Sequence, residues 1–266
     1  MTSYFPLLPS IESIHLDKNI HSSTTFLNHP NNLRKLNQTK YATQSIYFGT
    51  YKLERGLWKI ISIDECKYGE FVEIRRKSIN EQPDQMVVSV VNHENLFPES
   101  TRFLPKPQSL RIDASLVAER ASLNYHFGVG TTTYQGEYPF AMSNLQKSSF
   151  WSFDAFKEKN SEQNSFESFL ILMNINRDAE ENSEVNLEIY SPLHSKKKLQ
   201  QTTHKNSFTI IDLKDVNRKL GLDQPDQIFF IQCKSCAFIP MILSVDVKTN
   251  QLSFEHTHPP IELLWG

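Results

Sequence analysis

The sequence predicts a mainly β protein: an antiparallel β-sandwich or a jelly-roll-like fold with two packed β units and one or two short helices. First, short runs rich in Val, Ile, Phe and Tyr recur from about residue 41 onward, separated by polar breaks. Second, several of these runs alternate apolar and polar residues, which is the period of a half-buried strand. Third, the clearest local helix pattern is the short stretch DLKDVNRKLG.

The predicted units follow changes in composition along the 266 residues. Residues 1–40 are rich in turn formers and are predicted to be an irregular N-terminal arm. Residues 41–156 are the predicted first β unit, and residues 157–266 the predicted second, a β-sandwich. The polar segment KEKNSEQNS marks the boundary between them. The alternative is one continuous β domain over residues 41–266.

The first unit begins with the runs QSIYFGTYKL, LWKIISI, EFVEIRRK and MVVSVVN, which predict consecutive strands. The stretch that follows allows two interpretations. Asp113 can cap a helix. In the other interpretation a strand presents Leu123 and Tyr125 on one face and Asn124 and His126 on the other.

Polar side chains among the apolar residues of this region form a candidate ligand-binding set. Its members are Arg120, Asn124, Tyr134, Tyr138 and Trp151. The candidate catalytic residues of the same region are Glu137 and His126. The other interpretation is an ordinary strand with a polar outer face.

Trp151 belongs to SFWSFDAF, a stretch that concentrates aromatic residues. Aromatic rings at this density usually belong to a core. If they are exposed, they form a stacking platform for sugar rings or bases.

The second unit is predicted to carry one short helix among its strands, at residues 213–220. Asp212 is the expected N-cap, and Leu213, Val216 and Leu220 form one apolar stripe. Gly221 is the expected end, because glycine readily adopts the left-handed conformation that closes a helix.

Two apolar runs, residues 228–233 and 237–247, predict strands joined by a hairpin turn at Lys234-Ser235. Pro240 lies in the second run and predicts an edge strand or a bulge, because proline donates no ladder hydrogen bond. If Lys234-Ser235 form the turn, the thiols of Cys233 and Cys236 face each other and can oxidise. The other interpretation, which we favour, is that the two cysteines are small apolar residues beside a turn.

The last predicted strand carries a candidate metal site. His256 and His258 share a strand face, and Glu262 follows after a proline pair. Two imidazoles and a carboxylate suit Zn²⁺, Fe²⁺ or Mn²⁺. The spacing His-x-His-x(3)-Glu resembles the first motif of the cupin barrels, but Asn250 stands where that motif has glycine, so no family is assigned. The other interpretation is a polar strand end with a rigid tail.

The bulk composition narrows the expected partners and location. Lys and Arg number 28 against 30 Asp and Glu, so no basic excess favours nucleic acid. No apolar run approaches the roughly 20 residues of a membrane helix, and no signal peptide is recognised. Three cysteines do not suggest a disulfide framework. We therefore expect a soluble, cytoplasmic protein.

Three functions are consistent with these observations. The first is a binding protein without a catalytic motif, whose partner is a small molecule or a protein. The second is a metal-dependent enzyme that uses the predicted His256, His258 and Glu262 site, with a sugar derivative as one possible substrate. The third is a structural subunit of a homo-oligomeric assembly. Whether the protein is an enzyme stays open at this level.

Overall fold

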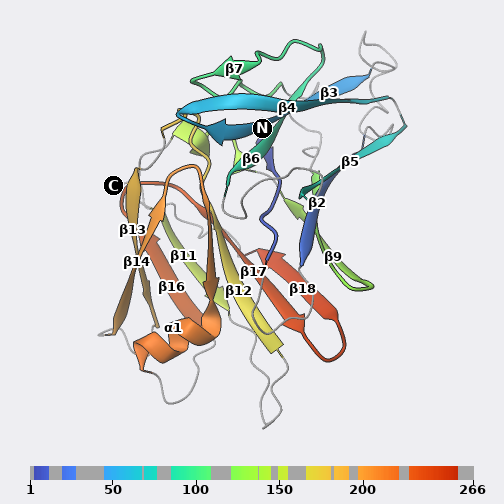
Figure 1. Cartoon of the computed structure of the whole chain (residues 1–266). Coiled ribbons are helices and arrows are strands. Elements are labelled where there is room, and N and C mark those ends of the chain that lie inside the picture. Colours follow the sequence, from blue (N-terminus) through green and yellow to red (C-terminus); the bar gives the residue numbers. More distant parts are fainter. Residues whose placement is uncertain are drawn as a thin grey trace, which may run out of the picture.

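The computed structural model describes the backbone of most of the chain. The described residues are 3–11, 20–27, 45–67, 69–76, 85–108, 121–136, 138–144, 149–154, 166–180, 183–191, 197–221 and 228–256. They form four sheets, and the strand pairs of these described residues are all antiparallel (Figure 1). The predicted mainly β, antiparallel class is therefore confirmed.

The first sheet has six strands in the order β10-β1-β6-β3-β4-β7. Their bounds are β1 Ser3–Pro6, β3 Ile46–Glu54, β4 Leu57–Cys66, β6 Val87–Asn92, β7 Ser100–Thr101 and β10 Tyr138–Pro139. The short 3₁₀ helix η3, Met142–Asn144, follows β10.

The second sheet has four strands in the order β5-β2-β8-β9. Their bounds are β2 His21–Leu27, β5 Phe71–Arg75, β8 Ala121–Phe127 and β9 Gly130–Gly136. One buried cluster holds side chains from both of these sheets, including Phe5, Phe26, Phe48 and Ile74. The two sheets therefore share a core.

Two further sheets of four strands form the second half, in the orders β11-β16-β13-β14 and β15-β12-β17-β18. The first contains β11 Ser149–Asp154, β13 Glu184–Tyr190, β14 Lys198–His204 and β16 Ile228–Cys233. The second contains β12 Phe166–Met173, β15 Phe208–Asp212, β17 Ile239–Asp246 and β18 Gln251–His256. One cluster again draws side chains from both sheets, including Leu170, Ile189, Ile231 and Ile242.

The helix α1, Leu213–Leu220, lies at the end of the molecule away from the six-stranded sheet (Figure 1). Asp212 caps it by accepting a hydrogen bond from the Lys214 amide, and Gly221 closes it in the left-handed conformation. Leu213, Val216 and Leu220 are its buried residues. The predicted helix, both its caps and its apolar stripe are confirmed.

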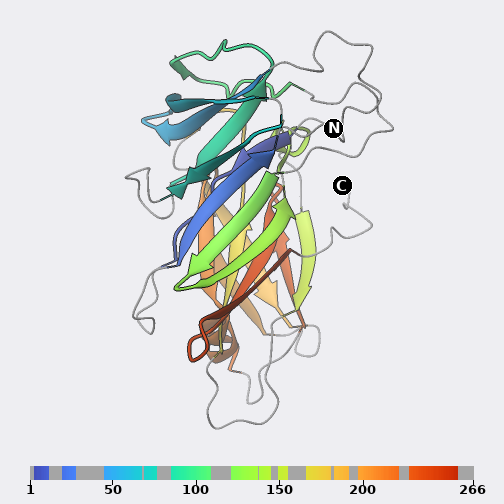
Figure 2. The same ribbon diagram turned by 90° about the vertical axis from the view of Figure 1, so that its right-hand side faces the viewer.

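A third cluster joins the two halves. The β8–β9 hairpin lies along β18 (Figure 2). The cluster combines Tyr125 of β8, Met241 of β17 and Phe254 of β18 with Tyr51 and Trp58 of the six-stranded sheet. The Phe254 ring meets the rings of Tyr125 and Tyr134 edge-on, at 5.1 and 6.1 Å between centroids.

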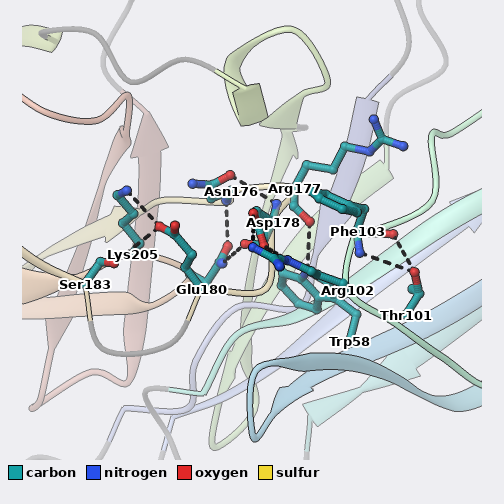
Figure 3. A network of polar contacts seen from close by, with 11 residues as sticks. Trp58, Thr101, Arg102, Phe103, Asn176, Arg177, Asp178, Glu180, Ser183 and Lys205 are labelled. Atoms are coloured by element: carbon teal, nitrogen blue, oxygen red, sulfur yellow. Dashed lines mark hydrogen bonds and ion pairs between the residues drawn. The ribbon is translucent and has the colours of Figure 1, made fainter.

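Polar contacts complete the connection around the loop that follows β12, residues 174–180 (Figure 3). Arg102 forms an ion pair with Asp178 at 3.2 Å. The Trp58 indole and the Leu104 amide both donate to the Arg177 carbonyl. This loop therefore ties the second half to the six-stranded sheet through backbone as well as side-chain groups.

The predicted irregular arm is corrected in part, because residues 1–40 include the strands β1 and β2. The sequence HSSTTFL looks like a loop, since it is mostly polar. It becomes a strand because β5 and β8 pair with it on either side. The division into two units stays a prediction, although β11, placed in the first unit, pairs with β16 of the second.

The predicted turn at Lys234-Ser235 is not a hairpin. β16 and β17 belong to different sheets, so this segment is a crossover between them. Pro240 does not mark an edge strand either, because β17 lies between β12 and β18. Proline is tolerated near the start of a strand, and within the described residues the pairing of β18 with β17 begins at Met241.

At Gly130 the β8–β9 hairpin approaches the β17–β18 turn closely. A Cβ atom there would lie 2.4 Å from the Asn250 carbonyl oxygen. We expect Gly130→Ala to lower the free energy of unfolding in urea by about 1–3 kcal/mol, because backbone must move. Val129→Ala is the matched control, since Val129 is 99% exposed, and should change little. A fully stable Gly130→Ala protein would show that the hairpins do not pack this way.

Within the described part of the chain, α1 has eight residues, and no helix there is long and apolar enough to cross a membrane.

Candidate functional site

A polar hydrogen-bond network covers the outer face of the β5-β2-β8-β9 sheet. In β8, Leu123 and Tyr125 point into the core, so Asn124 and His126 occupy the opposite face. In β2, Phe26 packs on Phe5 and Phe48 inside. The outer row of β2 therefore contains His21, Ser23 and Thr25, and register places these residues opposite His126, Asn124 and Ser122.

Ser23 and Asn124 are the centre of this network. The Asn124 amide donates to the hydroxyls of Ser23 at 3.1 Å and Thr25 at 3.0 Å. Its carbonyl oxygen accepts from Thr133 of β9 at 2.9 Å. Ser23 is 0% and Asn124 6% exposed, although both lie on the outer face. Neighbouring polar side chains thus shield and satisfy them.

His126 connects the network to charged groups. Its Nε2 lies 3.0 Å from the Ser23 hydroxyl, and its Nδ1 lies 3.1 Å from the Thr131 hydroxyl. Glu73 of β5 places a carboxylate oxygen 3.9 Å from the same Nε2. Arg75 in turn donates to Glu73 at 2.7 Å. The site therefore spans all four strands of the sheet.

The Ser23–His126 pair resembles a nucleophile beside its base, but its surroundings differ from those of a hydrolase. In a catalytic triad a carboxylate holds the imidazole nitrogen that faces away from the serine. Here the Thr131 hydroxyl occupies that place, and Glu73 lies on the serine side. Ser23 is also fully covered and already accepts from Asn124. The arrangement suits binding better than acyl transfer.

Hydrogen bonds from Arg75, and then from Ser23, lower the pKa of Glu73 despite its partial burial. A carboxyl group whose pKa is lower when folded stabilises the fold above its unfolded pKa of about 4.3, and this stability is lost as the pH falls through the folded pKa. We expect the thermal midpoint of the parent to exceed that of Glu73→Gln throughout the range from about pH 7 to pH 5. The difference should shrink below about pH 4.

Arg75→Gln removes the largest cause of the lowered pKa and is the companion variant for this pH series. The fall of its thermal midpoint with decreasing pH should be shallower than that of the parent. If the thermal midpoints of both variants fell with decreasing pH as steeply as that of the parent, the assigned network would be contradicted.

The other predicted ligand-binding residues do not join this network in the described structure. Tyr134 packs on Phe254, and Tyr138 is buried with its hydroxyl donating to the Ala237 carbonyl at 3.0 Å. Trp151 pairs with Ile231 in the β11–β16 ladder, and its side chain lies outside the described part. Arg120 and Glu137 lie outside the described residues altogether.

The predicted metal site lies largely beyond the described residues. His256 ends β18, opposite Met241, and its side chain is not among those described. His258 and Glu262 follow outside that part of the chain. Among the described residues no group of three or more His, Cys, Asp and Glu is placed to hold a metal ion. The site at His256, His258 and Glu262 stays a prediction.

Sequence reasoning identified Asn124 and His126 but missed the residues that complete the network, which are Ser23, Thr25, Glu73, Thr131 and Thr133. The sequence of β5 did contain a signal for an outer polar face, because Glu73 and Arg75 alternate with Val72 and Ile74. No signal in the sequence shows that β2 and β5 lie beside β8.

Comparison with known proteins assigns no family to the chain. No protein-family model and no curated protein matches it. Among solved structures, the crystal structure of the major pilin from Streptococcus pyogenes matches 91% of this chain and 92% of that chain at 9% identity. Its TM-score is 0.26, so this likeness carries no argument about fold or function. The predicted partners, cytoplasmic location and homo-oligomer stay predictions.

Proposed function

We propose that this chain is a non-catalytic binding protein whose polar face on the β5-β2-β8-β9 sheet binds a neutral, hydroxyl-rich ligand such as a sugar. The observation that supports this most is the shared Ser23, Asn124 and His126 network. It fixes donors and acceptors before a ligand arrives, which lowers the entropy lost on binding.

Charge and exposure support the choice of ligand. Glu73 and Arg75 neutralise each other, so the face carries little net charge to recruit an ion. His126 has a side chain 37% exposed and thus remains accessible. Thr131 and Thr133 are exposed beside it. Hydroxyl and imidazole groups can both donate and accept, as the hydroxyls of a sugar do.

We also infer that the two sheets of the second half form a β-sandwich. The support is the buried cluster to which both sheets contribute, together with the short connecting helix that packs against it. A β-sandwich of this kind leaves the outer faces of its sheets available for binding.

Ligand-observed NMR with a panel of neutral mono- and disaccharides tests the proposal. We expect at least one sugar to bind, and His126→Phe and Thr133→Val each to weaken it by about tenfold, the effect of about 1.4 kcal/mol in lost hydrogen bonding. Gln200→Ala is the control, because Gln200 is exposed on β14 of another sheet. Either no binding by any sugar, or binding that Gln200→Ala weakens as much as His126→Phe, would overturn the proposal.

A further inference from the structure

The thiols of Cys233 and Cys236 lie close enough to react with each other. Their sulfur atoms are 3.3 Å apart, and neither cysteine is in a disulfide bond. A disulfide bond is about 2.05 Å long and joins Cβ atoms about 3.8 Å apart. Bond formation therefore needs only a small approach of the two sulfurs.

The two cysteines differ in how strand pairing holds their backbone. Cys233 ends β16 and is held on both sides, opposite Ser149 of β11 and Leu187 of β13. Cys236 lies in the crossover to β17, outside any strand. Closure therefore requires a shift of the crossover segment and leaves the β16 ladder in place.

The surroundings of the pair favour one thiolate. A hydrogen bond from the Cys236 thiol, opposed by burial and aided by Ser235, lowers the pKa of Cys233 to about 6. The same hydrogen bond raises the pKa of Cys236. At neutral pH Cys233 is thus the nucleophile, and Cys236 retains its proton.

We propose that Cys233 and Cys236 form a reversible intramolecular disulfide when a peroxide oxidises the pair. Both cysteines are buried, at 0% and 4% exposure, whereas Lys234 and Ser235 between them are exposed, so a small oxidant reaches the sulfurs when this bend opens locally.

The reaction with hydrogen peroxide balances in two steps. The Cys233 thiolate attacks one peroxide oxygen and breaks the O–O bond, which gives a sulfenic acid and, after protonation, water. The Cys236 sulfur then attacks the Cys233 sulfur, loses its proton and displaces hydroxide, which leaves as the second water. The two thiols lose two electrons, and the peroxide gains them. A dithiol reductant reverses the change.

The crossover also connects the pair to the contact between the two halves. Ala237 follows Cys236. Its backbone carbonyl accepts hydrogen bonds from the Tyr138 hydroxyl at 3.0 Å and from the side-chain amide of Asn174. A shift of Cys236 moves this acceptor. Oxidation should therefore change the environment of Tyr138, which near-ultraviolet circular dichroism detects.

Intact-mass spectrometry of the folded chain after peroxide treatment is the decisive measurement. We expect a loss of about 2 Da, for two hydrogen atoms, and recovery with dithiothreitol. Thiol titration after denaturation should fall from three to one. Cys66→Ser is the matched control and should still lose about 2 Da, because Cys66 takes no part. Cys236→Ala should instead accumulate a sulfenic acid at Cys233 that dimedone traps.

Three results would overturn the proposal: a full thiol count after treatment, a disulfide that peptide mapping assigns to Cys66, or a covalent dimer. If Cys236→Ala does not fold, mapping of the parent protein still decides between these outcomes. None of the results depends on sugar binding, so this inference and the proposed function fail separately.

Discussion

Replacement of Phe254 with alanine is expected to lower the free energy of unfolding by about 3–5 kcal/mol, the usual cost of truncating a buried aromatic side chain. Phe254 is 5% exposed and lies between the two halves of the molecule. The truncation removes its edge-on contacts with Tyr125 and Tyr134 and leaves a cavity in the cluster that both halves share.

Urea denaturation followed by circular dichroism measures this loss. Phe254→Leu should restore part of the stability, because leucine fills part of the cavity. Phe71→Ala is the second control, since Phe71 is 67% exposed on β5, and should change stability by less than about 0.5 kcal/mol. A Phe254→Ala loss below about 1 kcal/mol would show that the shared cluster does not join the halves.

Asn206→Ala is expected to lower the free energy of unfolding by about 2–4 kcal/mol, through lost hydrogen bonds and backbone strain. Asn206 is 3% exposed in the turn between β14 and β15. Its side-chain oxygen accepts a hydrogen bond from the backbone N–H of Asn176 at 2.6 Å. Its side-chain nitrogen donates to the backbone carbonyl of Asp178 at 2.8 Å. Alanine leaves both backbone groups without these partners, next to the loop shown in Figure 3.

Two further substitutions separate the hydrogen bonds from the strain. Asn206 has a φ of 55°, a left-handed conformation that asparagine and glycine tolerate better than alanine. Asn206→Gly should therefore be more stable than Asn206→Ala by about 1 kcal/mol. Asn206→Asp keeps the acceptor for Asn176 and loses the donor to Asp178. Equal stabilities for the alanine and glycine variants would contradict the strain, and a parent-like alanine variant would contradict both causes.

The candidate site illustrates how far sequence alone reaches. One of the two interpretations of this stretch places Asn124 and His126 on one strand face, and β8 confirms it, because the alternation of apolar and polar residues is a local property. Tyr134 was grouped with them only by proximity in the sequence. It lies on the opposite, inward face of β9 and packs on Phe254.

The crossover at Lys234-Ser235 shows the same limit for the fold. The two flanking strands were correctly located, but they were assigned to one hairpin. A polar break between two apolar runs looks the same whether the chain turns back in one sheet or passes to another. The choice depends on which distant strands complete each sheet, and here β11 and β13 pair with β16, whereas β12 and β18 pair with β17.

The sequence by itself determined the mainly β class and the helix α1 with Asp212 and Gly221 at its ends, and the strand alternation of β8 was one of two interpretations that it allowed. These features depend on hydrogen bonds and periodicities within a few residues of the chain. Only the tertiary structure decided that β2 is a strand, that Ser23 and Glu73 meet His126, and that Phe254 joins the two halves. Such contacts arise between segments far apart in sequence, where the stability comes from burial and from strand pairing that no local pattern encodes.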